Sequence, residues 1–576
     1  MCGIFGYIGK SEDAPRKVFS GLKDIEYRGY DSWGVASWSL DAGHWLLEKK
    51  TGFLPESFNA PKSSVAIGHT RWATHGGATE VNAHPHLSCD GKIVLVHNGI
   101  VENYLELKKG ITHPSSGGNN HQIKSETDSE IIIHLIEDEL KNNNFKDSVS
   151  IIFKKLEGLS ALVVSDGKEI VVCKVGSPLV LGKTDDGYVV ASDPNAILPL
   201  TKNLYFLEDG DLFSLDFSLD NKFKEIDWQY SKADLDKFPH FMLKEIYEQP
   251  AVLYNQLQSL DSVKNIVEEI KLAHGTYFLG CGSAAYACIL AVYAFSKVAK
   301  KHVNFSLGSE FQFTADFITD KSLLVAISQS GETIDIIEPV SLAKKKGAKI
   351  VALTNTLGST LYRGANINAL LNAGVEKAVA STKALIAMMA NIILYSFGAA
   401  GKLQVGIKVI EESAKEIEEI IKKQDQIKEL ADKIKDSEHI YVLGRGISYP
   451  VALESALKIK EVSYIHAEGL ASGELKHGPI ALIDKGTPVI LFVPNDETKS
   501  AVLANAMEVK ARGAYVIGVG VESSPVFDYF FEIKDCGLSS VLPHIVFAQL
   551  LGYFLAVKLD RNPDKPRNLA KSVTVK

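Results

Sequence analysis

Short runs of alternating apolar and polar residues dominate the first part of the chain. Residues 3–8 predict a buried strand that directly follows a cysteine. Helical stretches appear near 15–25 and 127–141. Turn residues separate the further strands, which are expected at 64–70, 92–97, 159–165, 170–175 and 188–192. This pattern predicts packed antiparallel sheets with a few covering helices.

From about residue 255 the pattern changes to alternating strands and helices, which is typical of parallel, doubly wound sheets. The segment 277–283 is echoed at 441–447, 164 residues later. The segment 346–351 is echoed at 512–517, 166 residues later. This near-constant spacing predicts two copies of one α/β domain.

These patterns divide the chain into five parts. Mixed charge and the Phe238-Pro239 break indicate a linker before the repeated region. The predicted parts are a first domain at 1–220, the linker at 221–243, one α/β copy at 244–405, a second copy at 406–566 and a C-terminal tail at 567–576.

Composition narrows the possible partners and location. The 576 residues carry a net charge of −8 without a basic run, so no nucleic acid is expected as a partner. Six widely spaced cysteines without a C-x-x-C pair argue against a zinc site or a disulfide framework. Two uncharged stretches, 384–401 and 539–557, approach membrane-spanning length but contain polar residues, so buried helices are expected. Without a signal peptide, the protein is expected to be soluble and cytoplasmic, with no membrane partner.

Cys2 carries the clearest chemistry in the first domain. If Met1 is removed, Cys2 has a free α-amino group beside its thiol, and an amine with a pKa of about 8 can take up the thiol proton. One residue then supplies both nucleophile and base. The plainer interpretation is a chance Met-Cys start, and a lipid anchor is disfavoured because no apolar signal precedes the cysteine.

Further candidate residues follow predicted strands in the same domain. Arg71 opens a loop at a strand end, where an arginine suits bidentate capture of a carboxylate. Asn98 and Gly99 have N–H groups suited to an oxyanion hole, although spacing alone favours a tight turn. Asp128 lies at the start of the helix expected near 127–141, a position that suits a helix cap. His84-Pro85-His86 has no companion ligands nearby in sequence and is interpreted as a structural loop.

In the first α/β copy, the strand at 322–327 runs into Ser328-Gln329-Ser330-Gly331-Glu332-Thr333 and then into a helix. Hydroxyls, an amide and a glycine at a helix N-terminus suit a phosphate, and an ordinary capping box is the alternative. Cys281-Gly282-Ser283 and Val379-Ala380-Ser381 are expected to approach the same site. The second copy has Pro494-Asn495-Asp496 at this place, a poorer anion cradle, so one phosphate site per chain is expected.

The second copy and the tail add charged candidates. Glu454, Lys458 and Glu461 share one helical face, for which a solvated ion-pair ladder is the plainer explanation. His477 lies on a predicted loop, and histidine is the residue type whose charge can change at cell pH. The tail that contains Lys571 is too apolar and regular for a frayed end.

The first domain closely resembles the class II glutamine amidotransferases. The matching stretches are 2–4, 28–32, 71–76, 82–86, 97–99 and 126–128. The resemblance implies an α+β N-terminal-nucleophile hydrolase fold with four αββα layers. It implies these roles: Cys2 as nucleophile, Asn98 and Gly99 as oxyanion donors, Arg71 for the glutamine carboxylate, Asp128 for its ammonium, and Trp72, Thr74 and His75 on a loop that closes over glutamine.

The second half resembles a pair of sugar isomerase (SIS) domains through 328–333, 444–446, 458–461, 473–479 and 568–575. The resemblance implies doubly wound parallel sheets and places Val379 and Ser381 near the sugar phosphate. It implies phosphate binding by Ser283, Ser328, Gln329, Ser330 and Thr333, ring opening by His477 from a neighbouring subunit, a Schiff base at Lys571, proton transfer by Glu461 and assistance from Lys458.

End to end, the chain resembles the glutamine–fructose-6-phosphate aminotransferase family. The resemblance implies synthesis of glucosamine 6-phosphate from fructose 6-phosphate and glutamine, the first step of amino-sugar biosynthesis, with release of glutamate. Ammonia would pass through an internal channel gated by Trp72. No metal or organic cofactor is expected. The resemblance also implies a homodimer formed through the SIS domains.

Three departures from the family pattern leave alternatives open: Trp33, Ala284 and the stretch 363–366. Ala284 replaces a hydroxyl, which favours a paralogue that aminates another keto-sugar phosphate or takes a pre-aminated sugar. A sugar-phosphate sensor without turnover is a further alternative. The presence of Cys2, Glu461, His477 and Lys571 argues against a sensor, because binding alone needs no such groups.

Overall fold

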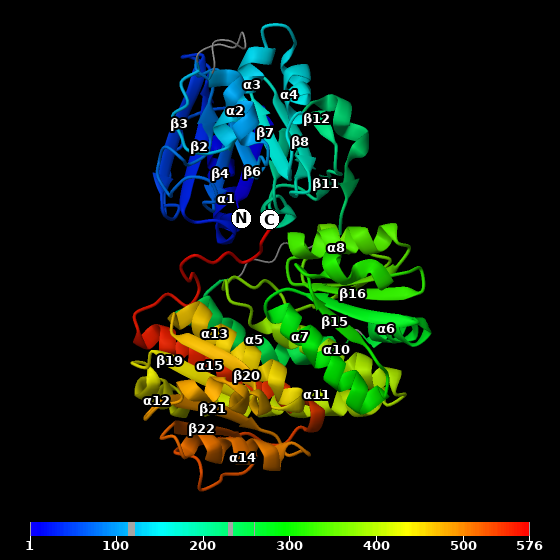
Figure 1. Cartoon of the computed structure of the whole chain (residues 1–576). Helices are drawn as coiled ribbons and strands as arrows, with labels where there is room; N and C mark the ends of the chain where they lie inside the picture. The colour runs from blue at the N-terminus through cyan, green and yellow to red at the C-terminus, as the bar shows by residue number, and fades with distance from the viewer. Residues whose placement is uncertain (1, 113–120, 228–233, 259, 575–576) are drawn as a thin grey trace. The chain divides into compact units, whose positions relative to one another are not determined.

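The computed structural model describes residues 2–112, 121–227, 234–258 and 260–574. By its internal contacts the chain divides into two compact units, one of Met1–Ser231 with Ser572–Lys576 and one of Lys232–Lys571. The elements of both units carry the labels of Figure 1.

Two antiparallel sheets build the first unit, in the orders β13-β11-β9-β10-β1-β4-β2-β3 and β12-β8-β7-β6-β5. The larger sheet contains β1 (Gly3–Gly9), β2 (Ser32–Ser39), β3 (His44–Thr51), β4 (Val65–Arg71), β9 (Val180–Lys183), β10 (Gly187–Ala191), β11 (Asn203–Phe206) and β13 (Lys224–Glu225). The smaller contains β5 (His86–Leu87), β6 (Val94–Gly99), β7 (Ser160–Ser165), β8 (Ile170–Val175) and β12 (Leu212–Ser214). The predicted antiparallel pattern is confirmed.

Strand β1 shows how the layers form. Ile4 and Phe5 are both fully buried, and successive side chains of a strand point to opposite faces. Ile4 packs into the core shared by the two sheets, whereas Phe5 packs with the residues of α1 (Ala14–Ile25). Helices α3 (Ser129–Glu139) and α4 (Phe145–Phe153) share a core with the smaller sheet. The order of layers is therefore αββα, as the resemblance implied.

Trp33 on β2 occupies this outer core. Its side chain is almost fully buried and lies among the residues that join α1 to the larger sheet. Its ring meets Phe19 of α1 edge-on, with the centroids 6.2 Å apart. This departure from the family pattern therefore fills space under α1.

Two five-stranded parallel sheets build the second unit, in the orders β15-β14-β16-β17-β18 and β20-β19-β21-β22-β23. The first contains β14 (Gly275–Gly280), β15 (Asn304–Leu307), β16 (Ser322–Ser328), β17 (Lys349–Thr354) and β18 (Ile367–Leu370). The second contains β19 (His439–Gly444), β20 (His466–Ala471), β21 (Pro488–Val493), β22 (Tyr515–Gly520) and β23 (Tyr529–Glu532). Both follow the same doubly wound order, which confirms the internal repeat.

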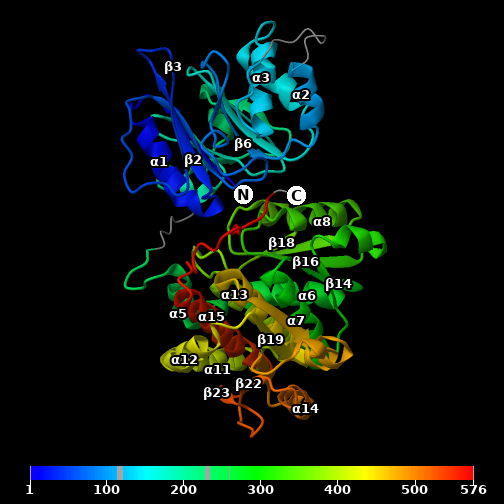
Figure 2. The same cartoon turned by 60° about the vertical axis from the view of Figure 1, so that its left-hand side comes forward.

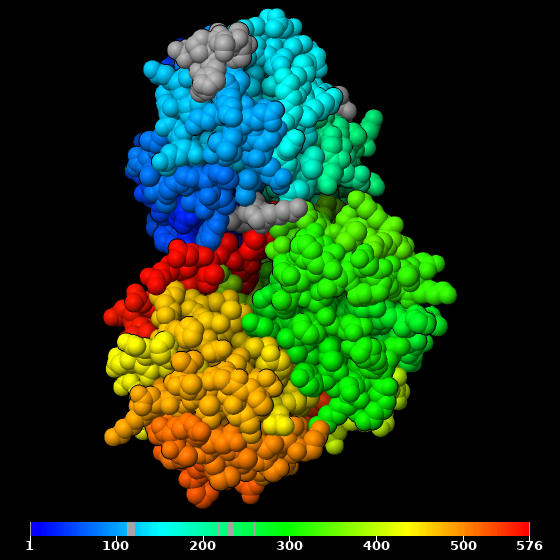
Figure 3. Space-filling model, in the orientation of Figure 1, coloured from blue at the N-terminus to red at the C-terminus, as the bar shows by residue number. Residues whose placement is uncertain are grey.

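Helices connect and cover these sheets. They are α5 (Phe241–Gln256), α6 (Leu260–Leu272), α7 (Ser283–Ala294), α8 (Ile334–Lys345), α9 (Thr360–Gly364), α10 (Lys383–Ala399), α11 (Leu403–Lys422), α12 (Gln424–Ile434), α13 (Tyr449–Ser463), α14 (Lys499–Lys510) and α15 (Val541–Lys558). One continuous core joins the two copies, which lie in direct contact in the space-filling view, green against yellow and orange (Figure 3).

The two long uncharged stretches form α10 and α15, as expected. Among the described residues, one helical span, Gly537–Lys558, is long and apolar enough to cross a membrane, but 94% of its apolar window is buried inside the protein. Nearly all of α10 is buried as well. Helix α15 runs beside α13 through the centre of the unit (Figure 2). Both are thus core helices, whose apolar surfaces are covered by protein.

Several elements do not follow the predicted domain boundaries, among them α5, which begins at Phe241 within the predicted linker. β13 falls within the stretch predicted as a linker and pairs with β11. Helix α11 spans residue 405, where the first α/β copy was expected to end. The apolar face of α11 belongs to the joint core, so the helix connects the two copies structurally.

A buried ion pair supplies a test of the first unit. Asp193 lies 3.1 Å from Arg28, and each side chain is 5% exposed. Asp193→Ala leaves the Arg28 guanidinium buried without this carboxylate, so the free energy of unfolding should fall by about 3 kcal/mol. All five tryptophans lie in residues 1–231, so tryptophan fluorescence during urea unfolding reports on this unit.

The exposed Asp41→Ala is the matched control and should leave the urea midpoint unchanged. Equal midpoints for the Asp193 and Asp41 variants would contradict the assigned role of the buried pair.

Candidate active sites

Cys2 directly precedes β1, a central strand of the larger sheet, and lies beside the end of β4. β1 and β4 are antiparallel, with Gly3 opposite Thr70, so the start of β1 adjoins the residues that follow β4. The Trp72 backbone N–H donates to Cys2 Sγ at 3.3 Å, and the same sulfur lies 3.6 Å from the Trp72 carbonyl oxygen. The half-buried thiol is therefore held against the loop that begins at Arg71.

Asn98 approaches Cys2 from β6 of the smaller sheet. Its Nδ2 donates to the Cys2 carbonyl oxygen at 3.0 Å. Its Oδ1 lies 3.0 Å from Nε2 of His69, a buried residue of β4. Burial lowers the pKa of His69 to about 3, so the ring is neutral and Nε2–H must be the donor. His69 thus fixes which end of the Asn98 amide faces Cys2, a role that the sequence did not suggest.

Gly99 completes this edge. Asn98 and Gly99 continue β6 and pair with Ala161 and Ser160 of β7, so the tight turn favoured by spacing is wrong. Gly99 has a φ of +147°, and a Cβ atom there would lie 2.0 Å from the Leu159 carbonyl oxygen. Only glycine fits this position without displacing β7.

The loop after β4 is wrapped around the buried Arg71 side chain. Arg71 Nη1 donates to the Gly77 carbonyl oxygen at 3.0 Å, and Nη2 donates to that of Gly76 at 3.1 Å. The Trp72 ring packs edge-on against Tyr30, and that of His75 packs against Tyr104 of α2 (Tyr104–Thr112). Thr74 is exposed on this loop.

Asp128 precedes α3 but does not cap it through its side chain. Its Oδ2 accepts the Val101 backbone N–H at 2.7 Å, and its Oδ1 lies 3.4 Å from the Ser129 hydroxyl. The helix-capping alternative is therefore wrong. The buried carboxylate is instead held beside the segment that follows Asn98 and Gly99.

In the second unit, the loop from β16 to α8 forms one wall of a cavity of about 150 Å³. The Ser328 hydroxyl accepts the Gly331 N–H at 3.1 Å and lies 3.0 Å from the Thr333 hydroxyl. The capping-box alternative is wrong, because Glu332 accepts from the Thr360 N–H. The cavity is lined by Cys281, Ser283, Ala284, Ile327, Ser328, Gln329, Ser330, Thr333, Ile336, Val379, Ser381, Met388, Glu461, Leu569, Ala570 and Lys571.

The lining of this cavity is rich in hydrogen-bonding groups. Within the part of the chain that the structure describes, the buried Ser381 hydroxyl has no hydrogen-bond partner. In the second copy, Asp496 instead pairs with Lys297 at 3.3 Å and accepts from Thr498. The sequence predicted a phosphate site in the first copy and none in the second. This contrast has a physical basis, because the carboxylate of Asp496 lies where a phosphate would have to bind.

Glu454 and Lys458 of α13 are fully buried and Glu461 is partly buried, so a solvated ladder is the wrong interpretation. Lys458 is fully buried, lies 3.3 Å from Glu454 and donates to Glu461, whose carboxylate reaches the cavity. Burial raises the pKa of Glu454 to about 7. Burial opposes the Lys458 charge, but the two carboxylates outweigh it and raise the pKa of the amine. Lys458 therefore remains a fixed positive charge behind Glu461.

Lys571 lines the same cavity. Its Nζ donates to the carboxylate of Glu376 and, at 2.7 Å, to the Ala378 carbonyl oxygen. Burial opposes the Glu376 charge, but Lys571 and backbone N–H donors outweigh it and lower the pKa of the carboxyl. Burial and the nearby Glu376 raise the pKa of Glu245 to about 8, so Glu245 is largely protonated at pH 7.

Sequence reasoning missed Glu376 and Glu245, which lie far from Lys571 along the chain. The only available signal was indirect, because a buried lysine requires a carboxylate nearby. His477, at the end of the 3₁₀ turn Ser472–His477, is exposed and does not line the cavity. Val379 lines it and donates its N–H to the Asp564 carbonyl oxygen.

The low pKa of His69 makes stability depend on pH. The unfolded chain binds a proton at His69 below about pH 6.5, whereas the folded chain does so only near 3. The free energy of unfolding should therefore fall as pH falls through this window, by about 2 kcal/mol at pH 5 from this residue. Urea unfolding followed by tryptophan fluorescence at pH 8 and pH 5 measures the change.

His69→Gln keeps a donor for Asn98 but does not titrate, so this variant should lose that part of the pH slope. A variant slope equal to that of the parent would contradict the buried neutral state of His69.

Comparisons with known proteins match one family model to the first compact unit and another to the second. A glutamine amidotransferase domain model matches residues 69–199, and a SIS domain model matches residues 269–395 and 433–530. The C-terminal domain of glucosamine-fructose-6-phosphate aminotransferase from Francisella tularensis has 35% sequence identity and a TM-score of 0.53, and covers 58% of this chain and 100% of that one. Tagatose-6-phosphate ketose/aldose isomerase from Escherichia coli, with 18% identity, a TM-score of 0.51 and coverage of 59% and 99%, shares the fold of the second unit.

Full-length relatives extend the similarity over both units. The chain is 39% identical to glutamine–fructose-6-phosphate aminotransferase (isomerizing) of Thermococcus kodakarensis over an alignment of 612 positions, gaps included, with 100% of both chains covered. It is 37% identical to the enzyme of the same name from Thermus thermophilus, again with 100% of both covered. The chain belongs to the glutamine–fructose-6-phosphate aminotransferase family.

Proposed function

We propose that this protein makes glucosamine 6-phosphate and glutamate from fructose 6-phosphate and glutamine. The observation that carries the proposal is the pairing of two different centres in one chain. Beside the Cys2 thiol, an oriented Asn98 amide donates to the Cys2 carbonyl oxygen, and a separate polar cavity is lined by Lys571 and Glu461. The full-length relatives of this name support both halves together.

In the first centre, the Cys2 thiolate attacks the side-chain amide carbon of glutamine. A thioester forms, the C–N bond breaks and ammonia leaves; water then cleaves the thioester to give glutamate. Asn98 Nδ2 and the Gly99 N–H would stabilise the oxyanion of each tetrahedral intermediate. The base would be the α-amino group of Cys2 after removal of Met1, which lies outside the described residues.

The substrate groups of glutamine would be held by residues around this edge. Arg71 would bind the α-carboxylate and Asp128 the ammonium, while Trp72, Thr74 and His75 would close over the ligand. The Arg71 guanidinium already donates to three carbonyl oxygens of its own loop. Capture of a carboxylate would therefore couple glutamine binding to rearrangement of that loop.

In the second centre, Ser283, Ser328, Gln329, Ser330 and Thr333 would bind the phosphate through hydroxyls and backbone N–H groups. The N-terminus of α8 favours an anion at this place. Val379 and Ser381 also line this cavity, where the Ser381 hydroxyl is available to a sugar oxygen. No cofactor or metal is needed for these contacts.

Lys571 would form an imine at C2 of the open-chain ketose, with loss of water. The amine must first release a proton, and the carboxylate of Glu376 is placed to accept it. Ammonia then displaces Lys571 from C2, and Glu461 carries a proton from C1 to C2. The fixed charge of Lys458 would hold Glu461 in position.

Ring opening would require a group from outside this chain's cavity. His477 is exposed and does not line the cavity of its own chain. A homodimer through the SIS domains would bring His477 of one subunit to the sugar of the other. Transfer of ammonia from the Cys2 centre to the Lys571 centre without release to solvent completes the proposed cycle.

A paralogue that aminates another keto-sugar phosphate is the second candidate. Ala284 supports it, because this residue lines the cavity where the family pattern has a hydroxyl. The names of the full-length relatives favour fructose 6-phosphate.

The role of Cys2 has a direct test. Cys2→Ala in the full chain should reduce glutamine hydrolysis to background, because the variant has no other proposed nucleophile at that edge. Binding of fructose 6-phosphate, measured by calorimetry, should be unchanged. Retained glutamine hydrolysis would refute the assignment.

The role of Lys571 is tested by trapping. Borohydride added with fructose 6-phosphate should reduce the imine and attach the sugar to Lys571, as mass spectrometry of peptides would show. Lys571→Arg keeps the charge and should remain unlabelled. A sugar adduct at a different lysine would retire the proposed role.

A further inference from the structure

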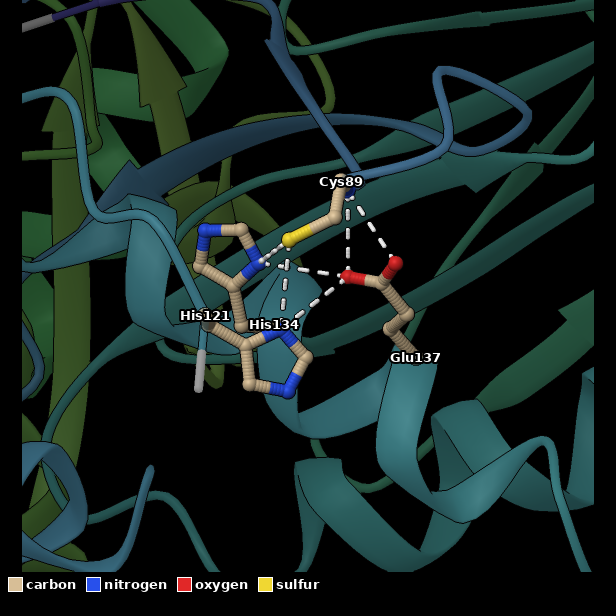
Figure 4. A group of neighbouring side chains, drawn as sticks. All are labelled: Cys89, His121, His134 and Glu137. Atoms are coloured by element: carbon tan, nitrogen blue, oxygen red, sulfur yellow. Dashed lines mark hydrogen bonds and ion pairs between the residues drawn. The ribbon is translucent and has the colours of Figure 1, made fainter. Parts of the chain in front are cut away.

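Four side chains of the first unit converge on one point away from Cys2. They are Cys89, between β5 and β6, His121, and two residues of α3, His134 and Glu137 (Figure 4). Their ligand atoms all lie within 4.8 Å of one another. The proposed glutaminase chemistry uses none of these residues.

Four of the six separations between these atoms match a tetrahedral metal site. Cys89 Sγ lies 3.3 Å from His121 Nδ1 and 3.6 Å from His134 Nδ1. Glu137 Oε2 lies 3.3 Å from each of the same two nitrogens. Tetrahedral zinc, with bonds of ~2.0–2.1 Å to nitrogen or oxygen and ~2.3 Å to sulfur, separates neighbouring ligand atoms by ~3.3–3.6 Å.

The surroundings favour lone pairs, rather than protons, at the centre of this group. His121 Nε2 lies 3.1 Å from Asp138, and His134 Nε2 lies 3.7 Å from Glu130, although neither pair is aligned as a hydrogen bond. A carboxylate behind each ring favours a proton on Nε2 and leaves Nδ1 as the acceptor. Two such nitrogens, a carboxylate oxygen and a sulfur then face one another.

An ion-pair network is the competing explanation. Both histidines would then be protonated and pair with Glu130, Glu137 and Asp138. This arrangement places two imidazolium rings with their centroids 4.8 Å apart, each with a side chain 2% exposed. A single divalent cation satisfies the same carboxylates and also accounts for the convergence of Cys89 Sγ on both Nδ1 atoms.

We propose that Cys89, His121, His134 and Glu137 bind a structural Zn²⁺ ion. One thiolate, two imidazoles and one carboxylate are ligands that zinc accepts, and four protein ligands leave no open position for substrate. The Cys89 backbone N–H donates to both oxygens of Glu137 at 3.1 Å, which holds that carboxylate beside the thiol.

The ion would hold α3 in place. It would tie the turn before β6 and the segment at His121 to two successive turns of α3. Asp128 and Ser129 stand at the start of that helix, and Ser129 Oγ lies 2.8 Å from His97 Nδ1 on β6. The site therefore stabilises the element that positions Asp128, without touching glutamine.

Metal analysis of the full chain tests the proposal. After incubation with Zn²⁺ and gel filtration, mass spectrometry of the metal should find about one zinc ion per chain. Cys89→Ser and Glu137→Gln should reduce this content to near zero. Glu139→Gln is the matched control, because Glu139 lies on the same helix but pairs with Lys155; it should keep the zinc.

A second readout is taken first on the parent chain, so it does not depend on the stability of a variant. Co²⁺ bound in place of Zn²⁺ should give the thiolate-to-metal absorption band of a tetrahedral site, and Cys89→Ser should lose it while keeping its circular dichroism spectrum. Absence of stoichiometric zinc from the parent chain would overturn the proposal. Equal zinc in the Glu137 and Glu139 variants would overturn it as well, because the metal would then bind elsewhere.

Discussion

The second centre depends on two positive charges that are buried away from water. Each of them must therefore be paired with a carboxylate. The Lys458 ammonium is fully buried between Glu454 and Glu461. The Lys571 ammonium is held by Glu376, which is itself fully buried. An unpaired charge in either place would cost several kcal/mol, so the carboxylates are needed for folding before they serve chemistry. The groups that we propose as catalytic in this cavity are therefore also required for stability.

The same constraint acts in milder form at Cys2. His69, within the sheet, is kept neutral by burial and donates an Nε2–H hydrogen bond to the Asn98 side-chain oxygen. The Asn98 amide is then oriented before any ligand arrives. Donors fixed in advance stabilise a developing oxyanion without paying for reorganisation during the reaction.

Sequence patterns predicted those parts of the molecule that depend on local order. The strand after Cys2, the internal repeat and the polar loop at Ser328–Thr333 follow from periodicity and turn residues over short windows. The αββα layers and the roles of Asn98 and Lys571 came from the family resemblance. Neither source requires knowledge of which distant residues meet.

The misinterpretations all concern burial or long-range contact. Glu454 and Lys458 of α13 look solvated because spacing shows one shared face but not the start of α7, where Ser283 donates to Glu454. Asp128 resembles a helix cap because its hydrogen-bond donor, the Val101 N–H, lies 27 residues away. Glu376, His69 and the Cys89 cluster were missed for the same reason, since their partners meet only in the folded chain.

The central claim is that nitrogen from the glutamine amide is delivered to the sugar within the protein. The most direct measurement supplies amide-¹⁵N glutamine and fructose 6-phosphate in a buffer that contains excess unlabelled ammonium. The account predicts glucosamine 6-phosphate with undiluted ¹⁵N, formed in equal amount to glutamate. Product that carries the unlabelled nitrogen of the buffer, or glutamate without amino sugar, would contradict it.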